Sequence, residues 1–165
     1  MKNKRQMKNL TLAKYYKMKW ERRSVLVNNT FGLKYKSKGL REWYYLNLKK
    51  NNTILSVVIE YDGSKPEYGI YYGIRTKEGN LISNEILDVV KSDYYRKYWK
   101  NRNPTDSIDS VKNVFLPDNG EISEDGTYWP FWIRLEEKYN IDEAFVGAKV
   151  IIESLVQQKF EIIGL

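Results

Sequence analysis

The chain has 165 residues, of which 42% are hydrophobic and 30% are charged, a composition typical of one folded domain with a single core. Its 28 Lys and Arg exceed its 21 Asp and Glu, so the formal net charge is +7. The sequence contains no cysteine and no histidine, which excludes disulfides, Cys/His zinc sites, histidine-ligated haem, and Ser-His-Asp or Cys-His catalytic triads.

The first 80 residues predict a helix followed by an antiparallel sheet. Residues 1–8 are polar and basic and are expected to form a loose arm, whereas residues 10–23 place apolar side chains at helical spacing. Four later segments predict strands, because three of them alternate apolar and polar residues and the third in order is apolar on both faces. The turns between them are short, so consecutive strands should be antiparallel neighbours in a meander. The predicted strands cover residues 31–38, 40–48, 53–61 and 68–76.

The C-terminal half predicts mainly helices. Ser83 or Asn84 can cap the first of them, and Pro104 prevents its continuation. Residues 103–127 are rich in Asp, Ser, Asn and Gly and predict a loop. We interpret the aromatic segment that follows as a helix, because Pro130 suits a first helical turn. The predicted helices cover residues 84–101, 128–139 and 143–158.

Together these elements predict an α+β fold. It should contain an antiparallel meander sheet of three to four strands, packed with an N-terminal helix and about three C-terminal helices. We expect a single domain over residues 1–165, in which the basic arm precedes a helix-plus-sheet part (9–80) and a helical part (81–165).

Ten apolar residues, which lie on the faces of the helices and strands that should be buried, are predicted to form the core. The segment Trp129–Trp132 should act mainly as a packing clasp, because two indoles bury a large area, although a role at an interface is the alternative. The predicted core residues are Leu46, Val57, Ile59, Ile70, Ile74, Ile86, Val90, Trp132, Ile152 and Leu155.

The acidic tract near residue 120 does not fit a calcium loop. If Gly120 is aligned with the glycine that an EF-hand loop requires, Phe115 and Gly126 fall at the first and last ligand positions. Both positions need carboxylates, so we interpret the tract as a solvated acidic turn.

A carboxylate-metal nuclease site is also poorly matched. Such a site needs an acidic residue near one strand and Glu-x-Lys on the next. The Glu-x-Lys of this chain is Glu136–Lys138, in a predicted helix, and the acids Glu60 and Asp62 have Lys65 nearby at the wrong spacing. We therefore expect no catalytic residue, no bound metal and no cofactor, with a hydrolase based on Glu60 and Asp62 as a distant alternative.

Positive charge is concentrated at the N-terminal end. Residues 1–50 carry 15 Lys and Arg against two Glu, a net charge of +13, whereas residues 103–165 carry a net charge of −7. This asymmetry is typical of a basic surface for a polyanion. The alternative is that the two ends lie together and neutralise each other.

Two stretches combine cations with aromatic rings, a combination that binds phosphates and stacks bases. One is the predicted strand with three alternating lysines, which should form one continuous positive surface with cations of the first 23 residues. The other is the helix end 94–102. The alternatives are a lysine-rich edge strand that discourages aggregation and a helix whose rings belong to the core. The predicted phosphate- or partner-binding residues are Lys4, Arg5, Arg22, Arg23, Lys34, Lys36, Lys38, Arg96, Lys97, Lys100 and Arg102, with aromatic contacts from Tyr95, Tyr98 and Trp99.

Three short segments resemble a known family. They are Tyr71-Tyr72-Gly73-Ile74-Arg75, Tyr128-Trp129-Pro130-Phe131-Trp132 and Phe160-Glu161-Ile162-Ile163-Gly164-Leu165. In this order, over roughly residues 40–165, they are similar to the C-terminal accessory region of PD-(D/E)XK-type nuclease-superfamily proteins of bacteria and phage. The nuclease core that this family places before that region is absent, so no catalytic residue carries over.

The resemblance implies an accessory module that exists without its nuclease. We therefore expect a cytoplasmic, non-enzymatic binding module, encoded by a phage or mobile element, that inhibits a host defence protein or protein–nucleic-acid complex through a basic surface. Direct nucleic-acid binding is the first alternative, and a metal-dependent hydrolase is the second. The expected partner is an acidic protein surface or a nucleic acid, with no membrane partner; the oligomeric state is left open.

Overall fold

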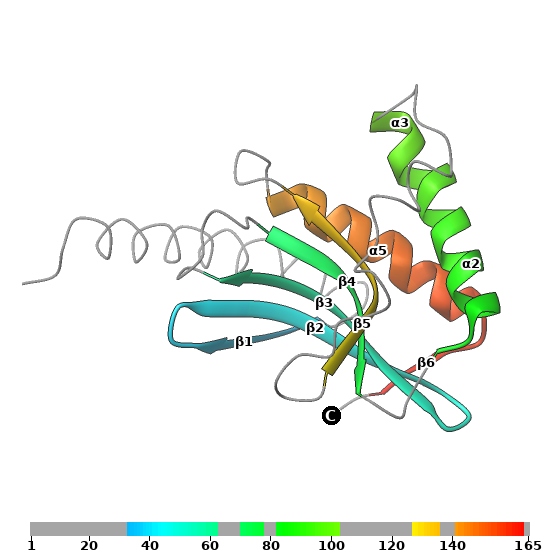
Figure 1. The fold of residues 1–165 in the computed structure, drawn as a ribbon, viewed down its shortest axis with the longest axis horizontal. Helices are drawn as coiled ribbons and strands as arrows, with labels where there is room; N and C mark the ends of the chain where they lie inside the picture. The colour runs from blue at the N-terminus through cyan, green and yellow to red at the C-terminus, as the bar shows by residue number, and fades with distance from the viewer. Residues whose placement is uncertain (1–32, 63–69, 78–81, 103–126, 136–140, 164–165) are drawn as a thin grey trace, which may run out of the picture.

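A computed structural model of the chain describes residues 33–62, 70–77, 82–102, 127–135 and 141–163. The predicted arm and N-terminal helix lie outside these residues, as does most of the predicted loop at 103–127. Within the described part, an antiparallel sheet packs against a layer of two helices, so the predicted α+β class is confirmed (Figure 1).

The sheet is larger than the predicted one. Strands β1 (Lys34–Lys38), β2 (Arg41–Lys50), β3 (Thr53–Asp62) and β4 (Ile70–Lys77) form the predicted meander, and β5 (Thr127–Leu135) adds to the far side of β4. The short strand β6 (Glu161–Ile162) pairs with β2 beyond the end of β1. The described residues therefore contain a six-stranded sheet, in place of the three to four strands expected.

Alternation along the strands separates two faces. Tyr44, Leu46 and Leu48 of β2 are buried, whereas the residues between them are half-buried. Tyr44 packs edge-on against Phe145 of helix α5 (Ile141–Gln157), with ring centroids 5.2 Å apart, so these residues point to the helical layer. The central strand β3 is buried on both faces from residue 57 to 61, as its composition predicted.

Strand β5 corrects the prediction of a helix over residues 128–139. Its inward residues Phe131 and Ile133 are fully buried and alternate with Trp132, which is the period of a strand. Pro130 is tolerated because β5 is the last strand on the sheet path, where an amide donor is not needed on the outer side. The register shifts between Ile74 and Thr76 of the neighbouring strand, opposite this proline.

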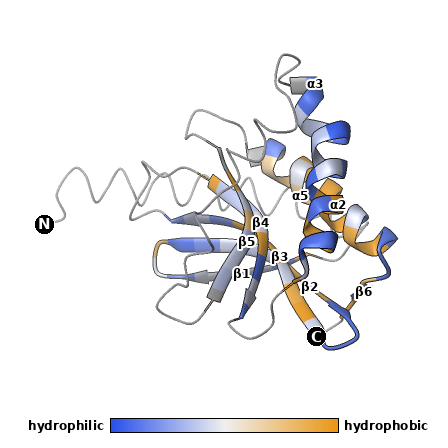
Figure 2. Cartoon of the chain, turned by 45° about the vertical axis from the view of Figure 1, so that its right-hand side comes forward, coloured by the Kyte–Doolittle hydropathy of each residue, from blue (hydrophilic) through white to orange (hydrophobic). Residues whose placement is uncertain are grey.

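The helical layer consists of α2 (Asn84–Tyr94) and α5, which pack against each other and against the inner face. The Ser83 side chain accepts a hydrogen bond from the Ile86 amide at 3.3 Å, which confirms one of the two predicted caps. The helix continues through a π-helical turn, η2 (Tyr95–Trp99), into α3 (Lys100–Arg102). Figure 2 shows hydrophobic residues along α5 and on the neighbouring strands, with hydrophilic ones over much of α2.

Eight of the ten predicted core residues are buried, and two are corrected. Ile86 is half-buried at the edge of the α2–α5 contact. Trp132 is also half-buried, because its place in a strand turns it away from Phe131 and Ile133 to the opposite sheet face. The buried predictions are Leu46, Val57, Ile59, Ile70, Ile74, Val90, Ile152 and Leu155.

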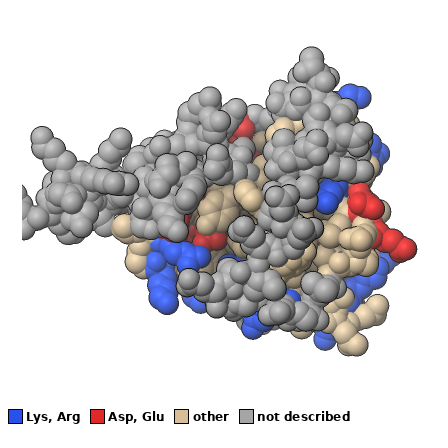
Figure 3. Space-filling model, viewed as in Figure 1, with Lys and Arg blue, Asp and Glu red and all other residues tan. Residues whose placement is uncertain are grey.

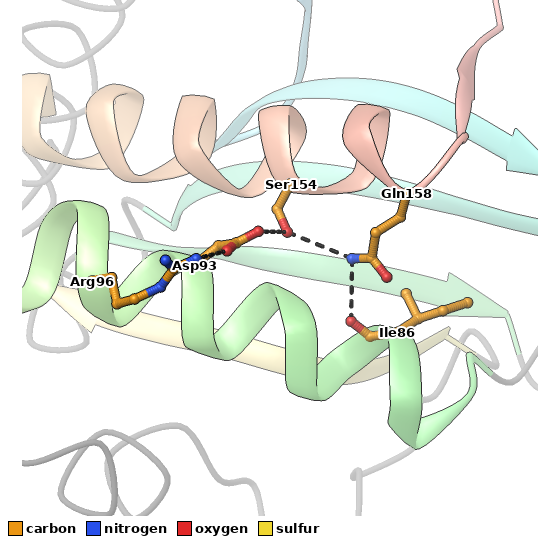
Figure 4. Close-up of polar contacts among 5 residues, drawn as sticks. All are labelled: Ile86, Asp93, Arg96, Ser154 and Gln158. Carbon is orange, nitrogen blue, oxygen red and sulfur yellow. Dashed lines mark hydrogen bonds and ion pairs between the residues drawn. The ribbon is translucent and has the colours of Figure 1, made fainter.

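A polar network joins the two helices (Figure 4). The buried hydroxyl of Ser154 donates to Asp93 Oδ2 at 2.7 Å, and Arg96 donates to Asp93 Oδ1 at 2.5 Å. Gln158 Nε2 then donates to the Ile86 carbonyl at 3.4 Å. The bonds from Ser154 and Arg96 satisfy a carboxylate that would otherwise be costly to bury between the helices.

Candidate nucleic-acid interface

The sheet face turned away from α2 and α5, which we call the outer face, collects cations and aromatic rings from four strands. Its members are set by the register, since directly paired residues point to the same side of a sheet. The outer face includes Lys34, Lys36 and Lys38 of β1, Arg41, Trp43 and Tyr45 of β2, Glu60 of β3, Tyr71 and Arg75 of β4, and Trp129 and Trp132 of β5.

The β1–β2 hairpin (residues 34–50) supplies a basic end of the outer face. Lys36 and Lys38 are exposed, and Lys34 is half-buried. In Figure 3, Lys and Arg atoms gather at the lower left of the molecule, where this hairpin lies, with Asp or Glu atoms beside them. The predicted placement of three lysines on one strand face is therefore confirmed.

Trp43 sits among these cations. The Lys36 ammonium, directly across from it on β1, lies 5.8 Å from the indole centroid, and the Arg41 guanidinium lies 5.7 Å from it. Both distances are within the range of cation–π attraction. The ring therefore helps to hold two positive charges at one place on the sheet.

A buried acid is already neutralised on this face. Glu60, which is 2% exposed, accepts two hydrogen bonds from Arg41 on one carboxylate oxygen, at 3.1 Å from Nε and 2.5 Å from Nη2. These bonds raise the pKa of Arg41, and burial together with the Glu60 charge raises the pKa of Tyr71. Arg41 thus remains a cation and Tyr71 remains neutral. Because the charges of Arg41 and Glu60 cancel, no uncompensated charge is left by this ion pair near the centre of the sheet.

The hypothesis of a metal site at Glu60 and Asp62 gains no support from their surroundings. Asp62 follows Glu60 on the same side of β3, but Arg41 occupies the carboxylate that a metal would need. Among the residues that the structure describes, no group of three carboxylates could hold an ion. Lys65, the Glu136–Lys138 pair and the acidic tract near residue 120 lie outside the described residues.

A second aromatic group lies at the β4–β5 side of the outer face. Trp129 packs edge-on against Tyr71, with centroids 5.8 Å apart, and the Arg75 guanidinium lies 5.8 Å from the indole centroid. Trp132 pairs with Gly73, where a Cβ would overlap the Phe131 carbonyl and lie 2.6 Å from the Trp132 Cα. Glycine therefore allows β5 to approach β4 closely enough to place both indoles.

The other predicted stretch, residues 94–102, lies in the helical layer. Tyr98 is 5% exposed, and its ring packs against that of the buried Tyr94, with centroids 5.3 Å apart. Tyr95 and Trp99 are half-buried against the core. Three of its predicted cations, Arg96, Lys97 and Lys100, are exposed, and the first of these binds Asp93. The structure therefore does not bring this stretch to the outer face. The side chain of Arg102 and the predicted residues Lys4, Arg5, Arg22 and Arg23 lie outside the described residues.

Sequence reasoning missed several members of this face. Arg41 and Trp43 are not among the predicted binding residues, because their contacts with Lys36 and Glu60 depend on the register of the strands. Trp129 was predicted to pack within a helix, with a role at an interface as the alternative; the alternation of Phe131, Ile133 and Leu135 is the signal that would have revealed the strand.

Comparison of the chain with protein-family models, with curated proteins and with solved structures finds no match. The resemblance to the accessory region of the nuclease superfamily therefore stays a prediction. The described residues contain no helix that is both long enough and apolar enough to cross a membrane.

Proposed function

We propose that the chain is a non-enzymatic binding module that holds the phosphates of a nucleic acid on the basic end of its outer face. The observation that carries the proposal is the position of Lys36 and Lys38. Both are exposed on the same side of β1, and within the described part of the chain neither forms a salt bridge. Ammonium groups in this state can neutralise phosphates and release their counterions.

The surroundings of these lysines support a polyanionic partner. Arg41 lies beside them and neutralises the buried Glu60, so this carboxylate does not oppose a polyanion at the basic end. Residues 1–50, which include the hairpin, carry a net charge of +13. An acidic protein groove, as expected for an inhibitor of a host defence complex, would use the same charges, and it becomes the better account if nucleic acid does not bind.

The test is the affinity for labelled DNA and RNA strands, measured by fluorescence anisotropy at several salt concentrations. We expect the variant Lys36→Glu/Lys38→Glu to bind about tenfold more weakly or worse. The slope of log affinity against log salt should fall by about 0.7 for each lost contact with a single strand, or about 0.9 with a duplex. The melting temperature should change little, because exposed charges contribute little to stability.

The matched control is Lys97→Glu/Lys100→Glu, which makes the same change of charge in the helical layer. We expect only a small loss of affinity from it. A larger loss from the control than from the hairpin variant would contradict the proposal and would favour the helix end 94–102. Absence of salt-dependent binding to any nucleic acid would also contradict it.

A further inference from the structure

We infer that the outer face binds single-stranded nucleic acid in preference to a duplex, with bases stacked on the indoles of Trp43 and Trp129. This inference rests on the proposed function and deepens it. It starts from the observation that the cations of the outer face are arranged around rings: Lys36 and Arg41 lie against Trp43, and Arg75 lies against Trp129.

The rings remain only partly buried on the outer face. Trp43, Trp129 and Trp132 are half-buried there, on the side of the sheet away from the core residues Tyr44, Tyr72 and Phe131, although Trp43 also packs against the core cluster. Exposed charge alone would suffice for a partner that offers only phosphates or carboxylates. Flat rings with cations beside them suit a partner that also presents flat π faces.

An undistorted duplex offers these rings no exposed base faces. Its bases are stacked inside the helix, and a sheet face meets only its phosphates and groove edges. A single strand can turn its bases onto aromatic side chains while its phosphates remain near lysine and arginine. The chemistry of the outer face therefore matches unpaired nucleotides.

The two indoles lie at a distance that a strand can cover. Trp43 is on β2 and Trp129 is on β5, with β3 and β4 between them. At about 4.8 Å per strand spacing, the backbones are about 14 Å apart, which a few nucleotides of an extended strand can span. Glu60 lies between them on β3, but it is 2% exposed and paired with Arg41, so it presents no bare carboxylate to the phosphates.

The first test compares a labelled strand of about 20 nucleotides with the same strand annealed to its complement. We expect the single strand to bind at least about tenfold more tightly and to quench tryptophan fluorescence. Equal or tighter binding of the duplex would overturn the inference while leaving the proposed function intact. If neither form binds in a salt-dependent manner, the proposed function itself fails.

The second test replaces each indole in two ways. Trp43→Leu and Trp129→Leu keep apolar volume but remove the π face, and should each weaken single-strand binding by about fivefold or more without changing the salt slope. Trp43→Phe and Trp129→Phe should recover part of the loss. The control Trp99→Leu, in the helical layer, should leave affinity unchanged. Loss of affinity from Trp99→Leu but from neither outer-face variant would overturn the inference.

Discussion

Gly147 lies where α5 packs directly against the ring of Tyr72 on β4. A Cβ at this position would lie 2.6 Å from Cε2 and Cζ of Tyr72, and closer still to its hydroxyl. Tyr72 cannot move aside easily, because it is fully buried and its hydroxyl is hydrogen-bonded to that of Tyr94 at 2.5 Å. A glycine in mid-helix is therefore required by the contact between helix and sheet rather than by the helix itself.

We predict that Gly147→Ala destabilises the protein. The gain in helix propensity is worth about 1 kcal/mol, and overpacking against a fixed ring costs about 1–3 kcal/mol, so the balance should be unfavourable. The measurement is the free energy of unfolding in urea, with the single variant Gly39→Ala as a comparison at a turn glycine that has nothing within 4 Å but a positive φ of 61°. An increase in stability for Gly147→Ala would contradict the close packing of α5 on Tyr72.

The expected effect of replacing Trp132 depends on whether its segment is a helix or a strand. If Trp132 were a core residue in a helix, its replacement by alanine would lower the free energy of unfolding by about 3–5 kcal/mol. In strand β5 it is half-buried on the outer face, while its neighbours Phe131 and Ile133 hold the core. Replacing Trp132 in this position removes less buried area, so we expect a smaller loss of stability. Its main effect should be a change in the aromatic surface of the outer face.

The contact between α2 and α5 depends on a buried carboxylate with two donors. Asp93 is 7% exposed and accepts from Ser154, which is fully buried, and from Arg96, whose side chain is 64% exposed. The two donors should contribute unequally, since the exposed guanidinium exchanges readily with water and the buried hydroxyl does not.

We predict that Ser154→Ala destabilises the protein by about 1–3 kcal/mol, because it leaves one side of a buried carboxylate without its donor. Arg96→Ala should cost less than about 1 kcal/mol. Thermal and urea unfolding of the two variants provide the comparison. Equal losses, or a larger loss for Arg96→Ala, would contradict this description of the helix pair.

The sequence predicted correctly those helices and strands whose hydrophobic periodicity and terminal residues indicate the same structure. Alternation in β1, β2 and β4, apolar residues on both faces of β3, and the cap at Ser83 all correspond to observed features. Local patterns failed at β5, because Pro130 suits both a first helical turn and an edge strand, and only pairing with β4 decides between them. Contacts such as Arg41 with Glu60 and Trp129 with Tyr71 join residues far apart in sequence, so periodicity alone could not reveal them.

The absence of histidine gives the whole molecule a simple response to pH. Burial raises the pKa values of Tyr35 and Tyr72 above that of an exposed tyrosine, with the hydrogen bond to Glu42 adding to the effect at Tyr35. Each group favours the folded state while it stays protonated. This stabilisation is fully present below the unfolded pKa of about 10 and is lost as pH rises toward the higher folded values.

We therefore predict that the melting temperature is nearly constant between about pH 6 and 9, where few groups titrate, and falls steeply above about pH 10. Tyrosinate absorbance should develop in two phases, the second coinciding with unfolding. A melting temperature that stays constant well above pH 10 would contradict the burial of these hydroxyls.

At the scale of the molecule, the central claim is that the outer face, and not the helical layer, contacts nucleic acid. Ultraviolet crosslinking of the protein to a bound single strand, followed by mass spectrometry of its peptides, tests this most directly. We predict crosslinks in peptides of the β1–β2 hairpin and of β4 and β5, including Trp43 and Trp129. Crosslinks confined to residues 94–102 of the helical layer would contradict the claim.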